Sequence, residues 1–201
     1  MIFTETKLKG AYIIELEKLQ DNRGFFARTF CRREFEARRL NPNIVQCNIS
    51  YNKKKGTLRG MHYQAAPYQE AKLISCIRGA IYDVIIDIRP DSPTYRQWLS
   101  VELTAHHPPL TIETSHSPIN LSTHKLLYVP EGFAHGFLTL SDNAEVCYQM
   151  SEFYMPDYAR GIRWNDPAFN IKWPIAIAAM SEKDMQYPDF LDNHIERAQP
   201  V

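Results

Sequence analysis

The chain has 201 residues, of which 44% are hydrophobic and 23% are charged, and this balance excludes a disordered chain. The length fits one globular domain, with or without an appended tail. Lys and Arg together number 23, as do Asp and Glu, so the formal net charge is zero. A protein that holds nucleic acid through its phosphates is usually basic, so the charge argues against a nucleic-acid partner and leaves room for a local basic pocket.

The cysteines and the apolar segments predict a cytoplasmic protein that does not associate with a membrane. No Cys-x-x-Cys pair occurs, and we expect free buried thiols. The chain begins Met-Ile-Phe-Thr-Glu, without the apolar core of a signal peptide. The longest uncharged apolar stretch, around 173–180, is too short to cross a bilayer and contains a proline. The four cysteines are Cys31, Cys47, Cys76 and Cys147.

The predicted elements, taken in chain order, are mostly β-strands. Segments rich in β-branched and aromatic residues alternate with turns that contain Gly, Pro, Asn or Asp. One helix is expected over 33–40, where Phe35 and Leu40 lie among charged residues and Asn41-Pro42 ends the pattern. Strands are expected over 11–17, 24–30, 44–50, 56–64, 71–77, 80–89, 98–103, 125–129, 136–140 and 144–150.

Many short strands at even spacing predict an all-β domain, an antiparallel sandwich or a small barrel. Residues 81–88 are almost continuously apolar, so we expect a central strand that is covered on both faces. Residues 105–123 are rich in His, Pro, Ser and Thr and lack periodicity, which predicts a long insertion between two strands. Residues 189–201 have the composition of a tail, which leaves a domain of residues 1–188.

The first segment that could carry chemistry is Leu58-Arg-Gly-Met-His-Tyr-Gln64. On a strand, Arg59 and Met61 would face one side and His62 and Gln64 the other. A histidine that points into a barrel is a candidate base, because the pKa of an imidazole lies near neutrality. The alternative is a buried histidine with a structural hydrogen bond.

The second segment is Pro130-Glu-Gly-Phe-Ala-His135, whose Pro-x-Gly-x-x-His spacing is similar to a signature of the cupin barrel. In metal-binding cupins this histidine joins a His-x-His pair and a Glu. Here the first motif is His62-x-Gln64, so two of the expected ligands are present, fewer than the three that a catalytic metal usually has. The sequence therefore argues against a metal site.

The third segment is Ser181-Glu-Lys-Asp184, which alone is typical of a surface turn. It gains meaning if Asp184 folds back onto a histidine, because a carboxylate on one ring nitrogen strengthens the other nitrogen as a base. Arg23, Arg59 and Lys72 could hold a diphosphate, since an arginine fork matches phosphate oxygens. Each of these residues is uninformative in isolation.

Taken together, the segments resemble the dTDP-4-dehydrorhamnose 3,5-epimerase family. This resemblance implies a homodimeric, cupin-like β-barrel or jelly roll with a few short helices and with neither metal nor other cofactor. It also implies a nucleoside-diphosphate 4-keto-6-deoxy sugar as substrate. The matching motifs, in order, are Asp21-Asn-Arg-Gly-Phe-Phe, Gln46-Cys-Asn48, Leu58-Arg-Gly-Met-His-Tyr-Gln64, Lys72-Leu, Tyr82-Asp-Val-Ile-Ile-Asp-Ile-Arg89, Ser92-Pro-Thr-Tyr, Pro130-Glu-Gly-Phe-Ala-His-Gly-Phe137, Trp164-Asn-Asp-Pro, Trp173-Pro and Ser181-Glu-Lys-Asp184.

The resemblance also implies a role for each matching residue. The catalytic group would comprise His62 as base, Asp184 as its partner, Tyr148 as the acid on the opposite face of the sugar and Lys72 near the developing oxyanion. The binding group would comprise Arg59 and His135 at the sugar and phosphates, and Gln46, Asn48 and Arg23 at the nucleotide, with Arg23 reaching into the partner subunit. The chain departs from the family pattern at Arg28, where the rhamnose-pathway enzymes carry a glutamate near the nucleotide.

Two other functions compete with an epimerase at this point: a metal-dependent cupin enzyme and a sugar-binding cupin without catalysis. The missing second histidine argues against the first, and the presence of a base, an acid and Asp184 argues against the second. Relatives of this fold invert C3, C5 or both. Because His62, Asp184 and Tyr148 serve all of them, these residues do not distinguish the three outcomes.

Overall fold

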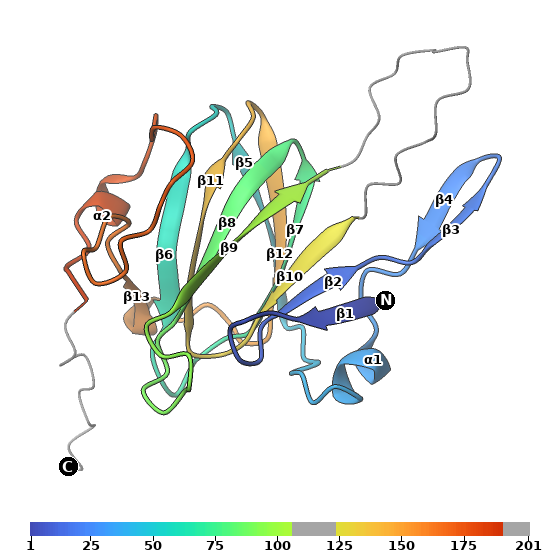
Figure 1. Ribbon diagram of the computed structural model, residues 1–201, viewed down its shortest axis with the longest axis horizontal. Coiled ribbons are helices and arrows are strands. Elements are labelled where there is room, and N and C mark those ends of the chain that lie inside the picture. The colour runs from blue at the N-terminus through green and yellow to red at the C-terminus, as the bar shows by residue number, and fades with distance from the viewer. Residues whose placement is uncertain (106–123, 191–201) are drawn as a thin grey trace.

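Two antiparallel sheets make up most of the molecule in the computed structural model, which describes residues 1–105 and 124–190 (Figure 1). The larger sheet has six strands in the order β1-β2-β10-β7-β12-β5, and the smaller has five in the order β13-β6-β11-β8-β9. Residues 106–123 of the expected 105–123 insertion, and residues 191–201 of the expected tail, lie outside the described residues. The strands of the two sheets are β1 (Ile2–Glu5), β2 (Tyr12–Glu15), β5 (Gln46–Asn52), β6 (Leu58–Gln64), β7 (Lys72–Arg78), β8 (Ala80–Asp87), β9 (Trp98–Thr104), β10 (Lys125–Val129), β11 (Phe133–Thr139), β12 (Ala144–Met150) and β13 (Ala159–Gly161).

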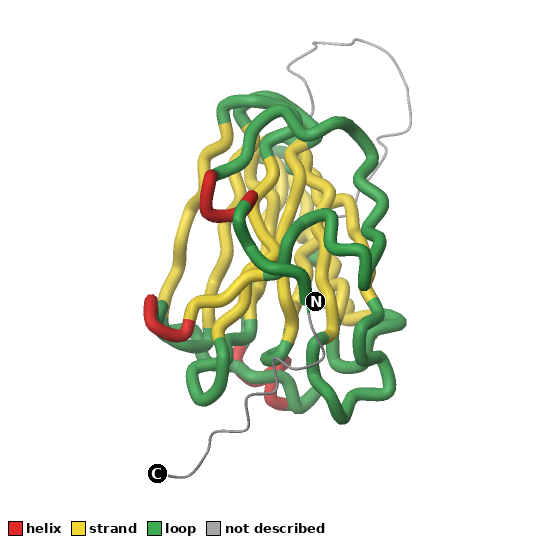
Figure 2. Tube along the Cα trace, turned by 90° about the vertical axis from the view of Figure 1, so that its left-hand side faces the viewer, coloured by secondary structure: helices red, strands yellow, loops and turns green. Residues whose placement is uncertain are grey.

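The inner faces of the two sheets pack on each other in a sandwich, and the turned view shows the strands running side by side along its length (Figure 2). Ile74 and Leu127 from the larger sheet and Ile81 and Ile85 from the smaller are fully buried in one shared cluster. Period-2 alternation directs these side chains inward. The all-β, cupin-like sandwich expected from the sequence is confirmed.

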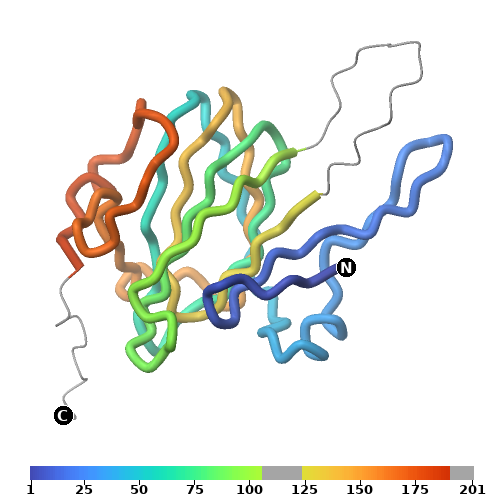
Figure 3. Tube along the Cα trace, viewed as in Figure 1, coloured from blue at the N-terminus to red at the C-terminus, as the bar shows by residue number. Residues whose placement is uncertain are grey.

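Strand β8 is covered on both faces, as its continuous apolar run predicts. Ile81 and Ile85 face the core between the sheets, whereas Val84 and Ile86 belong to a second buried cluster on the outer face. The C-terminal part of the chain supplies the cover for that face through Ile162, Phe169 and Ile171 (Figure 3).

The helix near the N-terminus is shorter than expected. It spans α1 (Arg32–Glu36), whereas the pattern predicts 33–40. Arg39 has a left-handed backbone with φ of 58°, and the Leu40 N–H donates to the Phe35 carbonyl at 3.0 Å while the Arg39 N–H donates to Glu36. These two bonds are a Schellman ending, so the helix stops before the Asn41-Pro42 signal is reached.

A two-stranded hairpin, β3 (Lys18–Asp21) and β4 (Gly24–Ala27), projects away from the sandwich (Figure 1). Its side chains include three large apolar residues that solvent reaches: Leu19, Phe25 and Phe26 are 69%, 51% and 70% exposed. A monomer rarely leaves such residues gathered in the open, so this hairpin has the composition of a contact surface.

Three further features differ from the sequence predictions or add to them. Asp189 forms an ion pair with Arg163 at 2.5 Å, and Phe190 packs on Phe169, so the expected tail boundary at 189 lies too early. All four cysteines are free, but only Cys76 is buried, which corrects the expectation that all are. Among the described residues, no helix is long and apolar enough to cross a membrane.

Candidate functional site

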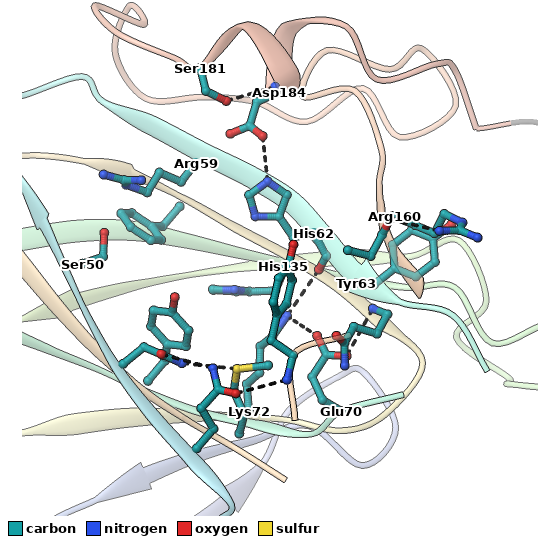
Figure 4. Close-up of a pocket in the computed structure, with 18 of the residues that line it drawn as sticks. Ser50, Arg59, His62, Tyr63, Glu70, Lys72, His135, Arg160, Ser181 and Asp184 are labelled. Atoms are coloured by element: carbon teal, nitrogen blue, oxygen red, sulfur yellow. Dashed lines mark hydrogen bonds and ion pairs between the residues drawn. The ribbon is translucent and has the colours of Figure 1, made fainter. Parts of the chain in front are cut away.

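A pocket of about 600 Å³ opens between the two sheets (Figure 4). Strands β6 and β11 of the smaller sheet form one wall, and β5, β7 and β12 of the larger sheet form the other. The pocket gathers every site residue predicted from the sequence except Arg23: Gln46, Asn48, Arg59, His62, Lys72, His135, Tyr148 and Asp184.

A bulge in β6 brings Arg59 and His62 to the same side. His135 of β11 pairs with His62, but Phe137 pairs with Arg59, so β6 carries one residue more than β11 over this stretch. Gly60 lies at the bulge with φ of +130°, and a Cβ there would come within 2.4 Å of the Gly136 Cα. The expected alternation, which separated Arg59 from His62, is therefore wrong, because a bulge shifts the side-chain period by one.

His62 is paired with Asp184 at the mouth of the pocket. The His62 Nε2 and Asp184 Oδ1 atoms are 2.7 Å apart, as Figure 4 shows. The His62 side chain is 44% exposed and that of Asp184 is 6% exposed. With the carboxylate accepting from Nε2–H, the Nδ1 atom is left to accept a proton.

A short helix positions Asp184. The Ser181 hydroxyl caps helix α2 (Glu182–Met185) by accepting from the Asp184 N–H at 3.1 Å. The second carboxylate oxygen accepts from the Gly60 N–H at 3.3 Å. Burial alone would raise the pKa of Asp184, but the hydrogen bond and charge of His62, together with the Gly60 and Ser181 contacts, lower it below its ordinary value. The carboxylate is therefore ionised at neutral pH.

His135 lies beside His62 and is held by a different acid. Its Nε2 atom is 2.9 Å from the Asp83 Oδ2 of strand β8, and the two side chains are 10% and 0% exposed. Burial raises the pKa of the Asp83 carboxyl, against the opposing effect of His135 and Lys72. His135 therefore lines the pocket with a buried imidazole whose orientation is fixed by Asp83.

The opposite wall carries a phenol and an ammonium group. Tyr148, on β12, is half-buried, and burial raises its pKa while the charge of Arg59 acts the other way. Lys72, on β7, forms a buried ion pair with Glu70 at 2.7 Å, and its Nζ atom also approaches the His62 carbonyl at 3.4 Å. The phenol is therefore a neutral proton donor at pH 7, and the same wall supplies a cation.

The pocket carries an excess of positive charge. Its two carboxylates, Glu70 and Asp184, are each engaged by a basic side chain. Within the described part of the chain no carboxylate pairs with Arg59, Arg160 or Lys183, which also line the pocket. The Arg59 Nε atom instead donates to the Asn52 amide oxygen at 2.7 Å. Such an arrangement suits an anionic ligand with more than one charge.

Gln64, which stands where a metal-binding cupin has its second histidine, has a structural task. Its amide nitrogen donates to the Tyr68 and Phe153 carbonyls at 2.8 and 3.1 Å, and its oxygen accepts from the Met155 N–H at 2.6 Å. Across the described residues, no three His, Cys, Asp or Glu side chains gather as metal ligands. The donors present do not fit a metal centre.

Two arginines singled out in the sequence lie away from this pocket. Arg23 is at the turn of the β3–β4 hairpin, 85% exposed, and forms an ion pair with Asp21 at 2.5 Å. Arg28 pairs with Glu34 at 3.0 Å. Arg23 therefore does not line the pocket of its own chain, and its expected reach into a partner subunit stays a prediction.

Sequence reasoning missed several lining residues. Glu70 could have been found, since it is two positions from Lys72 near a strand start, and Lys183 lies inside the Ser181–Asp184 motif. The others have no motif of their own and come together only in the fold. They include Ser50, Tyr63, Tyr154, Arg160 and Tyr187.

Comparisons with known proteins agree with one another. The sequence profile of the family described as dTDP-4-dehydrorhamnose 3,5-epimerase matches residues 5–192. A dTDP-4-dehydrorhamnose 3,5-epimerase of Shigella flexneri is 39% identical over 189 residues, which is 94% of this chain and 95% of that protein.

Solved structures give the same result. The Bacillus anthracis dTDP-4-dehydrorhamnose 3,5-epimerase with TDP and PPi bound has a TM-score of 0.82 and 37% identity, and the match covers 94% of this chain and 99% of that one. A Legionella pneumophila 3,5-epimerase in complex with dTDP-4-keto-L-rhamnose has a TM-score of 0.78 and 33% identity, over 91% of this chain and 89% of that one.

Proposed function

The chain belongs to the dTDP-4-dehydrorhamnose 3,5-epimerase family, and we propose that its pocket inverts C3 and C5 of a dTDP-linked 4-keto-6-deoxy sugar. It is an isomerase that acts on a nucleotide-linked sugar. The observation that carries the mechanism is the placement of a carboxylate-supported histidine on one wall of the pocket and a neutral phenol on the other.

The reaction is two cycles of proton removal and return. The C4 ketone acidifies the hydrogens on C3 and C5, so a base can take one and leave an enolate whose charge rests on the C4 oxygen. An acid on the opposite face then returns a proton to the same carbon, and the centre is inverted. Such chemistry needs a base, an acid across the ring and a cation near the enolate oxygen.

His62 is the base in this proposal, and Asp184 is its positioning partner. The hydrogen bond to Asp184 fixes the imidazole with Nδ1 free, and the ionised carboxylate stabilises the imidazolium that forms when the proton arrives. The His62 ring is half-exposed, so a ligand in the pocket can reach it, whereas the His135 ring is buried and less accessible.

Tyr148 is the acid. It belongs to the six-stranded sheet while His62 belongs to the five-stranded one, so a sugar ring between the sheets meets them on different faces. The raised pKa keeps the phenol protonated at neutral pH, so it can deliver a proton to the enolate. The tyrosinate left behind is close enough to Arg59 to be favoured by its charge.

Lys72 stabilises the enolate oxygen, and Glu70 keeps the ammonium in place. The ion pair at 2.7 Å fixes the position of Nζ before substrate arrives. We assign Arg59 and His135 to the sugar and the diphosphate. Gln46 and Asn48, whose amides are 3.2 Å apart on β5, contact the nucleotide.

Arg23 completes the nucleotide site from a second subunit, and the enzyme is a homodimer. The β3–β4 hairpin projects away from the sandwich (Figure 1). Arg23 lies at its turn and does not line its own pocket, and the hairpin exposes Leu19, Phe25 and Phe26. If a second copy covers this apolar surface, Arg23 enters the pocket of that copy and places a positive charge near the diphosphate. The cationic excess of the pocket supports a further anion-binding group there.

The remaining assignments follow from the same residues. We propose one epimerase domain, expected over 1–188 and extended by the contacts of Asp189 and Phe190 to at least residue 190, with 105–123 as an insertion. We also propose a cytoplasmic enzyme that uses neither metal nor cofactor. The comparisons favour neither a metal-dependent cupin enzyme nor a sugar-binding cupin without catalysis.

The direct test is incubation with dTDP-4-keto-6-deoxyglucose in deuterated water, followed by NMR of the recovered sugar nucleotide. Solvent deuterium at both C3 and C5, with inverted configuration, is the expected result. Deuterium at a single carbon would restrict the activity to that centre. The absence of deuterium at both carbons would contradict the proposed reaction.

A further inference from the structure

The segment that supplies Asp184 also supplies an aromatic ring to His62. Tyr187 follows helix α2, and its ring meets the imidazole edge-to-face, with centroids 5.9 Å apart and planes at 68°. Tyr187 lines the pocket, yet the roles assigned above do not use it. One short stretch of chain thus contacts the base on two sides, through the hydrogen bond that Asp184 accepts from Nε2–H and through the ring of Tyr187.

Gly161 makes room for this ring. In strand β13 it pairs with His62 of β6, and a Cβ built on it would lie 2.2 Å from both Cζ and Cε2 of Tyr187. Its φ is not in the left-handed region, so the backbone does not require glycine there. The Tyr187 ring explains why residue 161 is a glycine, because the ring occupies the space beside His62 into which a side chain at position 161 would project.

Tyr187 contacts its surroundings through its ring, which meets the His62 imidazole and lies over Gly161. Burial raises the pKa of Tyr187 to about 12, and the nearby Asp184, Tyr154 and Tyr63 act in the same direction. The group is a neutral phenol over the whole working range, and it adds no charge to the His62–Asp184 pair.

We propose that Tyr187 is a positioning residue for His62: its ring, seated on Gly161, restricts the imidazole to the orientation in which Nε2 meets Asp184 and Nδ1 faces the substrate. A half-exposed histidine on a strand has other rotamers open to it. The edge-to-face contact with Tyr187 favours one of them. The inference rests on the proposed role of His62 as base.

The experiment compares two changes at position 187 by the rate of deuterium uptake into substrate. Tyr187→Phe keeps the ring and should stay within about twofold of the wild type. Tyr187→Ala removes it and should lower kcat by roughly 10- to 100-fold with little change in KM, because misplacement of a catalytic group by about 1 Å has effects of that size. Tyr158→Ala, which removes a ring that packs on Tyr68 outside the pocket, is the matched control.

Two double-mutant tests separate positioning from general stability. If the ring acts through the His62–Asp184 bond, Tyr187→Ala should cost much less in an Asp184→Asn background than in the wild type. Gly161→Ala should displace the ring and lower kcat, but should have no effect once Tyr187→Ala is present. A purely structural role would give independent, multiplicative losses.

Several outcomes would overturn the inference: unchanged kcat in Tyr187→Ala, equal losses in Tyr187→Phe and Tyr187→Ala, or multiplicative effects in either cycle. His62→Ala is measured alongside. If His62→Ala keeps wild-type exchange, the proposed base is wrong. If His62→Ala loses exchange while Tyr187→Ala does not, the base stands and only the role of Tyr187 fails. Melting curves confirm that each variant is folded.

Discussion

His62 and His135 are direct cross-strand partners, and each is hydrogen-bonded to a different aspartate. The bond from His62 goes to Asp184 on a short helix, and the bond from His135 goes to Asp83 in the next strand of the sheet. Their side chains are 44% and 10% exposed, respectively. The two neighbouring imidazoles therefore differ in environment, and the more exposed one is the one that a ligand in the pocket can reach.

Replacement of the exposed histidine should stop proton exchange. His62→Ala is expected to lower deuterium uptake at C3 and C5 by about 10²–10⁴-fold, the usual contribution of a positioned base. Binding of dTDP, measured by calorimetry, should change little, since the nucleotide contacts lie elsewhere in the pocket. Exchange at the wild-type rate would remove His62 from the mechanism.

Loss of the Tyr148 hydroxyl should separate exchange from inversion. Tyr148→Phe keeps the ring and the packing, so His62 can still remove a proton and return one from solvent to the same face. We expect deuterium to enter unchanged substrate while the inverted product falls by at least about 10²-fold. NMR of the recovered sugar nucleotide distinguishes the two species. Undiminished inversion would show that another group is the acid.

The low pKa of Asp184 predicts how stability depends on pH. A carboxyl whose folded pKa is lowered adds stability above its unfolded pKa of about 4, and this contribution is lost as the pH falls through the folded value. Between about pH 6 and pH 3, the free energy of unfolding of the wild type should therefore decrease more than that of Asp184→Asn. Urea titrations across this range give both slopes, and parallel curves would contradict the prediction.

A hybrid dimer can show whether Arg23 acts across the subunit boundary. Arg23→Ala should raise KM for the nucleotide sugar, and His62→Ala should be inactive. If Arg23 enters the partner's pocket, a purified hybrid of the two variants contains one site with both residues intact and regains activity at low substrate. If Arg23 acts within its own chain, no site in the hybrid is complete, and the hybrid is no more active than the two parents.

Removal of metal ions should leave the activity unchanged. Gln64 is fully engaged with backbone groups, and His62 and His135 are each committed to an aspartate. We expect exhaustive chelation to have no effect on turnover. A loss that a divalent cation restores would require a different mechanism.

The sequence predicted the sandwich well because its strands carry their own signals. β10 and β12 begin and end where the pattern places them, and β8 is covered on both faces as its apolar run indicates. The end of α1 was missed, because the left-handed turn at Arg39 is occupied by a residue that rarely adopts it.

Within the site, long-range placement was the part that local patterns could not supply. The motif around Asp184 reads as a surface turn until the chain folds it over His62, more than 100 residues earlier in sequence. The bulge at Gly60 likewise has no signal beyond a glycine in a strand, yet it decides that Arg59 and His62 share a face. The resemblance to a known family singled out these residues as a set, whereas the fold explains why they lie together.

The close approach of β6 and β11 at Gly60 and Gly136 has a consequence for how such an enzyme can change. The main chains of the two strands lie in contact there, next to the cross-strand pair His62 and His135. Variation in the surrounding side chains can therefore alter which sugar or nucleotide is accepted without moving the proton-transfer apparatus. Divergence toward new substrates is expected to accumulate in the segment around Tyr154, whereas a Cβ at Gly60 or Gly136 would meet the backbone of the neighbouring strand.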